Sequence, residues 1–117
     1  MDFFVEKEGK VYCEDVCLED LAHQYGTPLY VYSLNTLILH CKHFLKVFKP
    51  FETLCCYALK ANNNATIVTI IGNEGFGADI VSLGELIQAT KAGIEPEKIV
   101  FSGVGKTKEE LIEAIKN

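Results

Sequence analysis

The stretch LCCYALKANNN, residues 54–64, decides the fold and contains the most unusual placement of a residue in the chain. It begins with an apolar run over residues 54–59, which is typical of a buried strand. Lys60 follows at once, although lysine is rarely buried unless it is paired. A polar turn of asparagines, residues 62–64, ends the stretch. The sequence therefore raises the question of why a core strand leads directly into a lysine.

Strand and helix patterns alternate on both sides of this stretch. Strands are predicted at residues 29–32, 54–59, 77–81 and 99–101, so the units repeat every 22 to 25 residues. A helical pattern follows each strand, and the clearest has the apolar face Leu34, Leu37, Ile38, Cys41, Leu45 and Phe48. Ser33 or Asn35 is expected to cap that helix, and Ser82 and Thr107 to cap later ones. Such alternation predicts parallel strands with helices outside.

Residues 1–26 have a different pattern. They predict a small hairpin, with strands near residues 3–5 and 11–13, and then a short helix that ends at Gly26. For the rest of the chain two architectures fit, a doubly wound open sheet or part of a (β/α)8 barrel. A whole barrel takes about 250 residues. The chain has 117, so we expect it to be truncated.

Composition narrows the function classes. The chain is 49% hydrophobic with a net charge of −5, which argues against a broad nucleic-acid binder. No stretch approaches the roughly 18 consecutive apolar residues that span a bilayer. The first residues lack the basic and apolar regions of a secretory signal. We therefore expect a cytoplasmic protein that binds neither nucleic acid nor membrane.

The five cysteines and three histidines give little sign of a site. An odd number of cysteines cannot all pair, and free thiols indicate a reducing compartment. Cys13 and Cys17 are spaced loosely like metal ligands, but no second pair follows, so we expect no metal. His40 and His43 flank the apolar face of one helix, and His23 is isolated. We expect none of the histidines to be catalytic.

The stretch FSGVGKT, residues 101–107, resembles the end of a phosphate-binding P-loop. That motif requires a glycine five residues before Gly105, where this chain has Val100. Thr107 is better explained as one half of a helix capping box with Glu110. The P-loop interpretation is rejected.

Lys60 is the strongest candidate for chemistry. The carboxyl ends of parallel strands meet at one edge, where ligands bind. Lys60 lies at that end of its strand with Ala58 on the same face, Asp79 lies in the next strand, and Ser102-Gly103 follows the last one. A neutral lysine amine among apolar walls forms Schiff bases with carbonyls. The alternative, which periodicity alone favours, is a lysine that reaches solvent or forms a structural ion pair with Asp79.

Four motifs together resemble one enzyme family. They are YGTPLYVYS (25–33), YALKANNN (57–64), GFGADIVSLGEL (75–86) and AGIEPEKIVFSGVGKTKEEL (92–111). In this order and spacing, from about residue 18 onward, the chain is similar to the N-terminal part of the diaminopimelate decarboxylase family. These are fold-type III, alanine-racemase-like decarboxylases that use pyridoxal 5'-phosphate. The resemblance implies the first four units of a (β/α)8 TIM-type barrel over residues 27–117. It also implies that residues 1–26 pack on a C-terminal β-domain.

The resemblance also implies a site and a reaction. Lys60 would hold pyridoxal phosphate covalently, Asp79 would lie beside that lysine and the cofactor, and Ala58 would line the cofactor ring. The substrate would be an amino acid, meso-2,6-diaminopimelate, which loses CO2 to give L-lysine in lysine biosynthesis. The full-length enzyme would be a homodimer. Leu83 departs from the family, which usually has glycine there, and this puts helix packing near the site in doubt.

Several alternatives remain beside this one. The remaining cofactor and substrate residues of the family lie beyond residue 117, so we expect the isolated chain to be inactive and prone to self-association. The parent enzyme could act on another diamino acid such as ornithine or arginine. The chain could also be a truncated, non-catalytic paralogue that only binds partners or cofactor. An alanine racemase fits less well, because its lysine is usually followed by A-N-A-Y-G.

Overall fold

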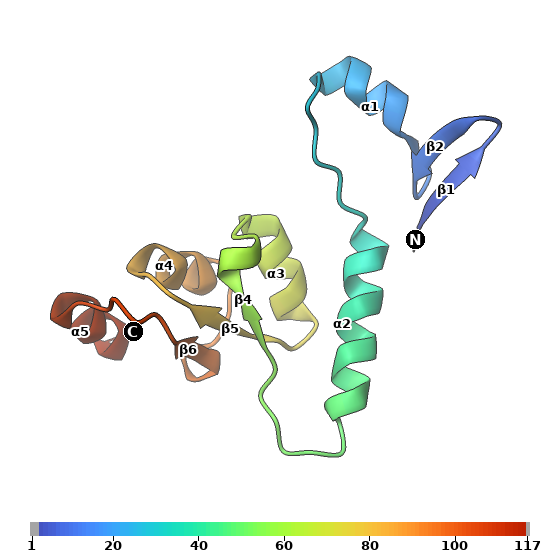
Figure 1. The fold of residues 1–117 in the computed structure, drawn as a ribbon. Helices are drawn as coiled ribbons and strands as arrows, with labels where there is room; N and C mark the ends of the chain where they lie inside the picture. The colour runs from blue at the N-terminus through green and yellow to red at the C-terminus, as the bar shows by residue number, and fades with distance from the viewer. Residues whose placement is uncertain (1–2, 117) are drawn as a thin grey trace. The chain divides into compact units, whose positions relative to one another are not determined.

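The computed structural model describes residues 3–116. Contacts divide the chain into two compact units, Met1–His40 and Cys41–Asn117 (Figure 1). The family resemblance implied a different division, with residues 1–26 packing on a C-terminal β-domain and residues 27–117 forming half of a barrel. That division stays a prediction. No helix within residues 3–116 is long and apolar enough to cross a bilayer.

The first unit begins with an antiparallel sheet and a short helix. Three strands pair in the order β1-β2-β3, and α1 follows them. Their bounds are Phe4–Lys7 for β1, Lys10–Cys13 for β2, Val16–Cys17 for β3 and Leu18–Tyr25 for α1. Gly26 ends α1 with a φ of 80°, a left-handed conformation that glycine adopts without steric cost. The predicted hairpin and the helix that ends at Gly26 are confirmed.

The strand predicted at residues 29–32 is wrong. The structure has neither helix nor strand there, and the Tyr30 side chain is 86% exposed. A strand needs a neighbour to satisfy its backbone N–H and C=O groups. No other strand of the described residues pairs with this segment. Its apolar and β-branched composition alone is therefore not enough to form a strand.

Helix α2, Leu34–Phe48, follows this segment and confirms the longest predicted helix. Ser33 precedes the helix and caps it, since its Oγ accepts a hydrogen bond of 3.0 Å from the Thr36 backbone N–H. Of the predicted caps Ser33 and Asn35, Ser33 is therefore the one that the structure uses. Cys41 is the buried member of the predicted apolar face.

The second unit is built on a parallel sheet in the order β4-β5-β6. The alternation of strands and helices is confirmed, with α3, α4 and α5 after the successive strands (Figure 1). The bounds are Cys56–Ala58 (β4), Leu59–Ala61 (η1, a 3-10 helix), Ala65–Asn73 (α3), Gly77–Ile80 (β5), Leu83–Lys91 (α4), Pro96–Lys98 (η2, a 3-10 helix), Ile99–Phe101 (β6) and Lys108–Lys116 (α5). The strand predicted at residues 54–59 is thus shorter, because the chain turns into η1 immediately after Ala58.

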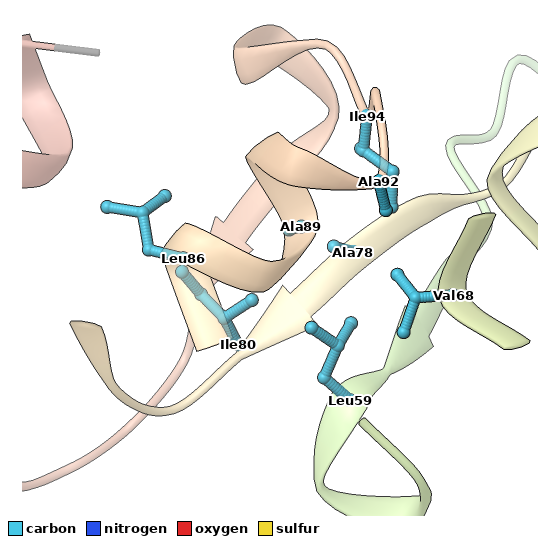
Figure 2. Packing of buried hydrophobic residues seen from close by; sticks show 8 residues of the cluster. All are labelled: Leu59, Val68, Ala78, Ile80, Leu86, Ala89, Ala92 and Ile94. Atoms are coloured by element: carbon cyan, nitrogen blue, oxygen red, sulfur yellow. The ribbon is translucent and has the colours of Figure 1, made fainter. Parts of the chain in front are cut away.

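One face of the parallel sheet supports the hydrophobic core. Successive side chains of a strand point to opposite faces, so Ala78 and Ile80 of β5 share a face, and both are fully buried. Figure 2 shows them with the rest of the cluster: Leu59, Val68, Leu86, Ala89, Ala92 and Ile94. Ala114 of α5 also packs against this cluster. Residues of α3, α4 and α5 therefore belong to one core on one side of the sheet, and the opposite face carries Ala58, Asp79 and Val100.

Candidate functional site

Lys60 lies in η1, directly after β4, and its backbone is held on both sides. Leu59, the residue before it, is fully buried in the core. On the other side, the Tyr57 hydroxyl donates a hydrogen bond of 3.1 Å to the Asn62 carbonyl. The Lys60 side chain itself is exposed. A fixed backbone thus presents a solvent-facing amine. Of the two environments considered from the sequence, the described residues supply the solvent-exposed one and not apolar walls.

The asparagines after Lys60 have a structural role that the sequence did not reveal. Asn62 Oδ1 accepts a hydrogen bond of 3.0 Å from the Asn64 backbone N–H. Asn64 is the N-cap of α3, and its Oδ1 accepts from the backbone N–H groups of Thr66 and Ile67, at 3.0 and 3.4 Å. These hydrogen bonds therefore fix the conformation of the short segment between Lys60 and α3. The available signal was the asparagine immediately before a helical pattern, which favours an N-cap.

Two of the predicted site residues are brought together by strand pairing. Ala58 of β4 lies opposite Asp79 of β5, and Asp79 lies opposite Val100 of β6. All three belong to the face that points away from the helices. Among residues 3–116, no carboxylate forms an ion pair with Lys60. The structural ion pair between Lys60 and Asp79, one of the alternatives, is therefore not formed.

The Asp79 carboxylate is instead held by Ser102. The Ser102 hydroxyl donates a hydrogen bond to Asp79 Oδ1. The Ser102 backbone N–H donates to the Ile80 carbonyl at 2.9 Å, which extends the pairing of the two strands beyond β6. The sequence placed Ser102 at this edge but gave no indication of its partner, because that contact depends on the register between β5 and β6.

Gly103 brings the two chain segments after β5 and β6 into close contact. A Cβ built on Gly103 would lie 2.6 Å from the Val81 carbonyl oxygen, closer than side-chain carbons approach backbone. Glycine is required here by close approach rather than by an unusual φ. The backbone segments that follow Asp79 and Ser102 are therefore packed directly against each other at Val81 and Gly103.

Glu85 is a buried carboxylate near this edge that the sequence analysis missed. Glu85 is only 8% exposed, and its Oε2 accepts a hydrogen bond of 2.7 Å from the Val81 backbone N–H. Ser82 Oγ accepts from the Glu85 backbone N–H at 3.3 Å and caps α4 as predicted. The signal was present in the sequence, because Ser82 and Glu85 have the spacing of a capping box. Leu83, where the family resemblance implies a glycine, is partly buried and packs against the core.

In the loop after β6, Lys106 and Thr107 make contacts within the chain. The Lys106 ammonium donates to the Phe101 carbonyl at 2.9 Å and lies 5.5 Å from the centre of the Phe101 ring. Thr107 and Glu110 form the predicted capping box. The Thr107 backbone N–H donates to Glu110 Oε2 at 2.9 Å, and the Glu110 backbone N–H donates to Thr107 Oγ1 at 3.2 Å.

The thiols and histidines form no metal-binding group within the described residues. All five cysteines are free, and burial raises the pKa of the Cys13, Cys41 and Cys56 thiols, so they act as small apolar side chains. Within residues 3–116, no group of three His, Cys, Asp or Glu side chains is close enough to hold a metal ion. His23, His40 and His43 are exposed, and their lack of a catalytic role stays a prediction.

Comparison with known proteins agrees with this arrangement. The chain is 48% identical over 116 residues to diaminopimelate decarboxylase of Vibrio cholerae, covering 98% of this chain and 28% of that protein. It is 50% identical over 109 residues to diaminopimelate decarboxylase of Aquifex aeolicus, covering 93% and 26%. The crystal structure of diaminopimelate decarboxylase from M. jannaschii in complex with L-lysine is similar with a TM-score of 0.93 and 37% identity, covering 98% and 28%.

The chain thus spans roughly a quarter of the length of these relatives, between 26% and 28%. A family model described as the pyridoxal-dependent decarboxylase, pyridoxal binding domain, matches residues 34–117. That range contains Lys60, Asp79 and Ser102. The chain therefore belongs to the pyridoxal-dependent decarboxylase family, as part of its pyridoxal-binding domain.

Proposed function

We propose that this chain is the N-terminal part of a pyridoxal phosphate-dependent diaminopimelate decarboxylase, which converts meso-2,6-diaminopimelate to L-lysine and CO2. The names of the Vibrio and Aquifex relatives support the substrate. The observation that carries the proposal is the placement of Lys60. A solvent-facing amine follows a buried anchor at the carboxyl end of a parallel strand, next to the face that carries Ala58 and Asp79.

The residues at this edge fit the part of pyridoxal phosphate that reacts with a lysine. The cofactor is an aldehyde, and a covalent bond to it requires an accessible amine without a competing carboxylate partner. Lys60 meets both conditions among the described residues. Ala58 has only a methyl group, so it leaves space above the sheet for a flat ring. When bound, the cofactor supplies the electron sink for the electron pair that remains after CO2 leaves.

The chain's own groups would prepare that chemistry by position and charge. Lys60 must lose a proton from Nζ before its lone pair can attack an aldehyde. Asp79 contributes a carboxylate on the neighbouring strand, where the Ser102 hydroxyl holds it and Lys60 does not. The pairing of Ala58 with Asp79 fixes the distance between the strands that carry these groups. Rigid strands position such groups more accurately than loops do.

The larger assembly is part of the proposal. A half (β/α)8 barrel is supported by α3, α4 and α5, which share one core on the same side of the sheet, whereas a doubly wound sheet has helices on both faces. We further propose that residues 1–26 pack on a C-terminal β-domain and that the whole enzyme is a homodimer. A cytoplasmic location is supported by the five free thiols, which suit a reducing compartment.

The test is a decarboxylation assay on the longer enzyme that contains this chain. With meso-diaminopimelate and pyridoxal phosphate, we expect L-lysine and CO2, and we expect Lys60→Ala to abolish their formation. The matched control is Lys91→Ala, which removes an exposed lysine of α4 and should leave turnover unchanged. Turnover of ornithine or arginine in place of diaminopimelate would transfer the substrate assignment to that diamino acid. Full activity of Lys60→Ala would overturn the role of Lys60.

A further inference from the structure

The strand order places Asp79 between two possible partners. Asp79 is on β5, the central strand of the sheet, with Lys60 following β4 on one side and Ser102 following β6 on the other. The register places Asp79 opposite Ala58, two residues before Lys60, and opposite Val100, two residues before Ser102. In the structure, Ser102 Oγ donates to Asp79 Oδ1, and no ion pair joins the Asp79 carboxylate to Lys60 among the described residues.

Ser102 is well placed to keep the aspartate on that side. Its backbone N–H donates to the Ile80 carbonyl at 2.9 Å, so the position of Ser102 is fixed relative to the strand that carries Asp79. The next residue, Gly103, packs directly on the Val81 backbone. The serine hydroxyl therefore projects from a backbone that is held at two consecutive residues.

We propose that Ser102 is a positioning residue, which holds the Asp79 carboxylate toward β6 and so keeps it from forming an ion pair with Lys60. The functional meaning of this restraint rests on the proposed attachment of pyridoxal phosphate to Lys60. A lysine in an ion pair keeps its proton to higher pH, and a protonated amine is not a nucleophile. Ser102 thus leaves the Lys60 amine available for reaction.

The restraint can be measured without the cofactor. Trace acetic anhydride acetylates only neutral amines, so the extent of acetylation of each lysine against pH reports when that lysine loses its proton. We would treat the folded chain at a series of pH values and quantify each acetylated lysine by peptide mass spectrometry. Lys91, exposed on α4, serves as an internal reference in every sample.

Ser102→Ala is expected to free Asp79 to pair with Lys60. The pH of half-maximal Lys60 acetylation should then rise by about 0.2–0.7 unit, the range of an exposed ion pair, while Lys91 stays unchanged. Ser102→Thr keeps the hydroxyl and should behave as the original chain. Asp79→Asn alone should change little, and in the double variant Asp79→Asn with Ser102→Ala the rise should disappear.

A Ser102→Ala profile that coincides with that of the original chain would overturn the proposal. A rise that persists in the double variant would also overturn it, because the carboxylate would not be its cause. Neither result depends on pyridoxal phosphate. Failure of the cofactor to attach to Lys60 would refute the proposed function. The restraint by Ser102 would then be judged from the acetylation data alone.

Discussion

Residues 29–32 and residues 56–58 are both short apolar stretches that predict strands, yet only the second stretch is a strand. Cys56–Ala58 has β5 as its parallel neighbour, and the residue after it, Leu59, is fully buried. Residues 29–32 have no strand partner among the described residues. The difference teaches that a strand is fixed by its neighbours and its core contacts more than by its own composition. It also explains why Lys60 has a rigid support.

The largest effect should come from the core that supports the sheet. Ile80→Ala removes a fully buried side chain of β5, and we expect a loss of about 2–5 kcal/mol in the free energy of unfolding. Tyr30→Ala, in the unpaired segment, removes a side chain that is 86% exposed and should change this free energy by no more than about 0.5 kcal/mol. Urea denaturation followed by circular dichroism measures both. Equal losses would contradict the contrast between the two regions.

A second, smaller effect tests the packing beside Asp79. Gly103→Ala would place a Cβ 2.6 Å from the Val81 carbonyl oxygen, so we expect a loss of about 1–3 kcal/mol in unfolding free energy. Gly105→Ala, two residues later, is the matched control, because no atom lies within 4 Å of its added Cβ. It should stay within about 0.5 kcal/mol of the original chain. If both variants unfold at the same urea concentration, the close contact at Gly103 is not present in solution.

The smallest expected effect is a loss of stability at low pH. It can be compared between the two units through one carboxylate in each, Glu14 and Glu110. The Asn35 backbone N–H and then the Ser33 hydroxyl lower the pKa of the Glu14 carboxyl, and the Thr107 backbone N–H lowers that of Glu110. A lowered pKa in the folded state means that each contribution is present at neutral pH and is lost as pH falls through the folded-state pKa, below 4.5. Both carboxylates lie at helix N-termini, where negative charge is favourable.

Amide NMR shifts of Asn35 and Thr107, followed from pH 7 to pH 3, would report these two contacts separately. We expect both amides to titrate below the ordinary glutamate range. Glu14→Gln should remove the titration seen at Asn35 and leave that at Thr107, and Glu110→Gln should do the reverse. Titration of Asn35 that persists in Glu14→Gln would show that another group holds the start of α2.

Much of the second unit was predictable because its signals are local. Strands were predicted at residues 77–81 and 99–101 and are found at Gly77–Ile80 and Ile99–Phe101. The helices after them were predicted from Ser82 and from the Thr107–Glu110 box. The hydrogen bond from Ser102 to Asp79 was not predictable, because it joins residues 23 positions apart through a strand register that composition does not encode. The strand predicted at residues 29–32 was wrong for a related reason, because a local pattern does not show whether a neighbouring strand is present to pair with it.

The candidate site was predictable only in part. Lys60, Ala58 and Asp79 were placed at one edge by the rule that parallel strands end together, and the pairing of Ala58 with Asp79 agrees. Two environments were open for Lys60, apolar walls or solvent, and its side chain is exposed. The amount of solvent around an amine depends on every segment that surrounds it. Sequence pattern near the lysine therefore predicts its position on the sheet better than its environment.

The most direct test of the central claim is to add pyridoxal phosphate to the purified chain, reduce with borohydride and map the labelled peptides. If the end of β4 presents a reactive amine, label will be confined to the peptide that contains Lys60 and will be absent in Lys60→Ala. Label spread over exposed lysines such as Lys91, or a Lys60 peptide that stays unlabelled, would contradict the claim that this strand end is the cofactor attachment site.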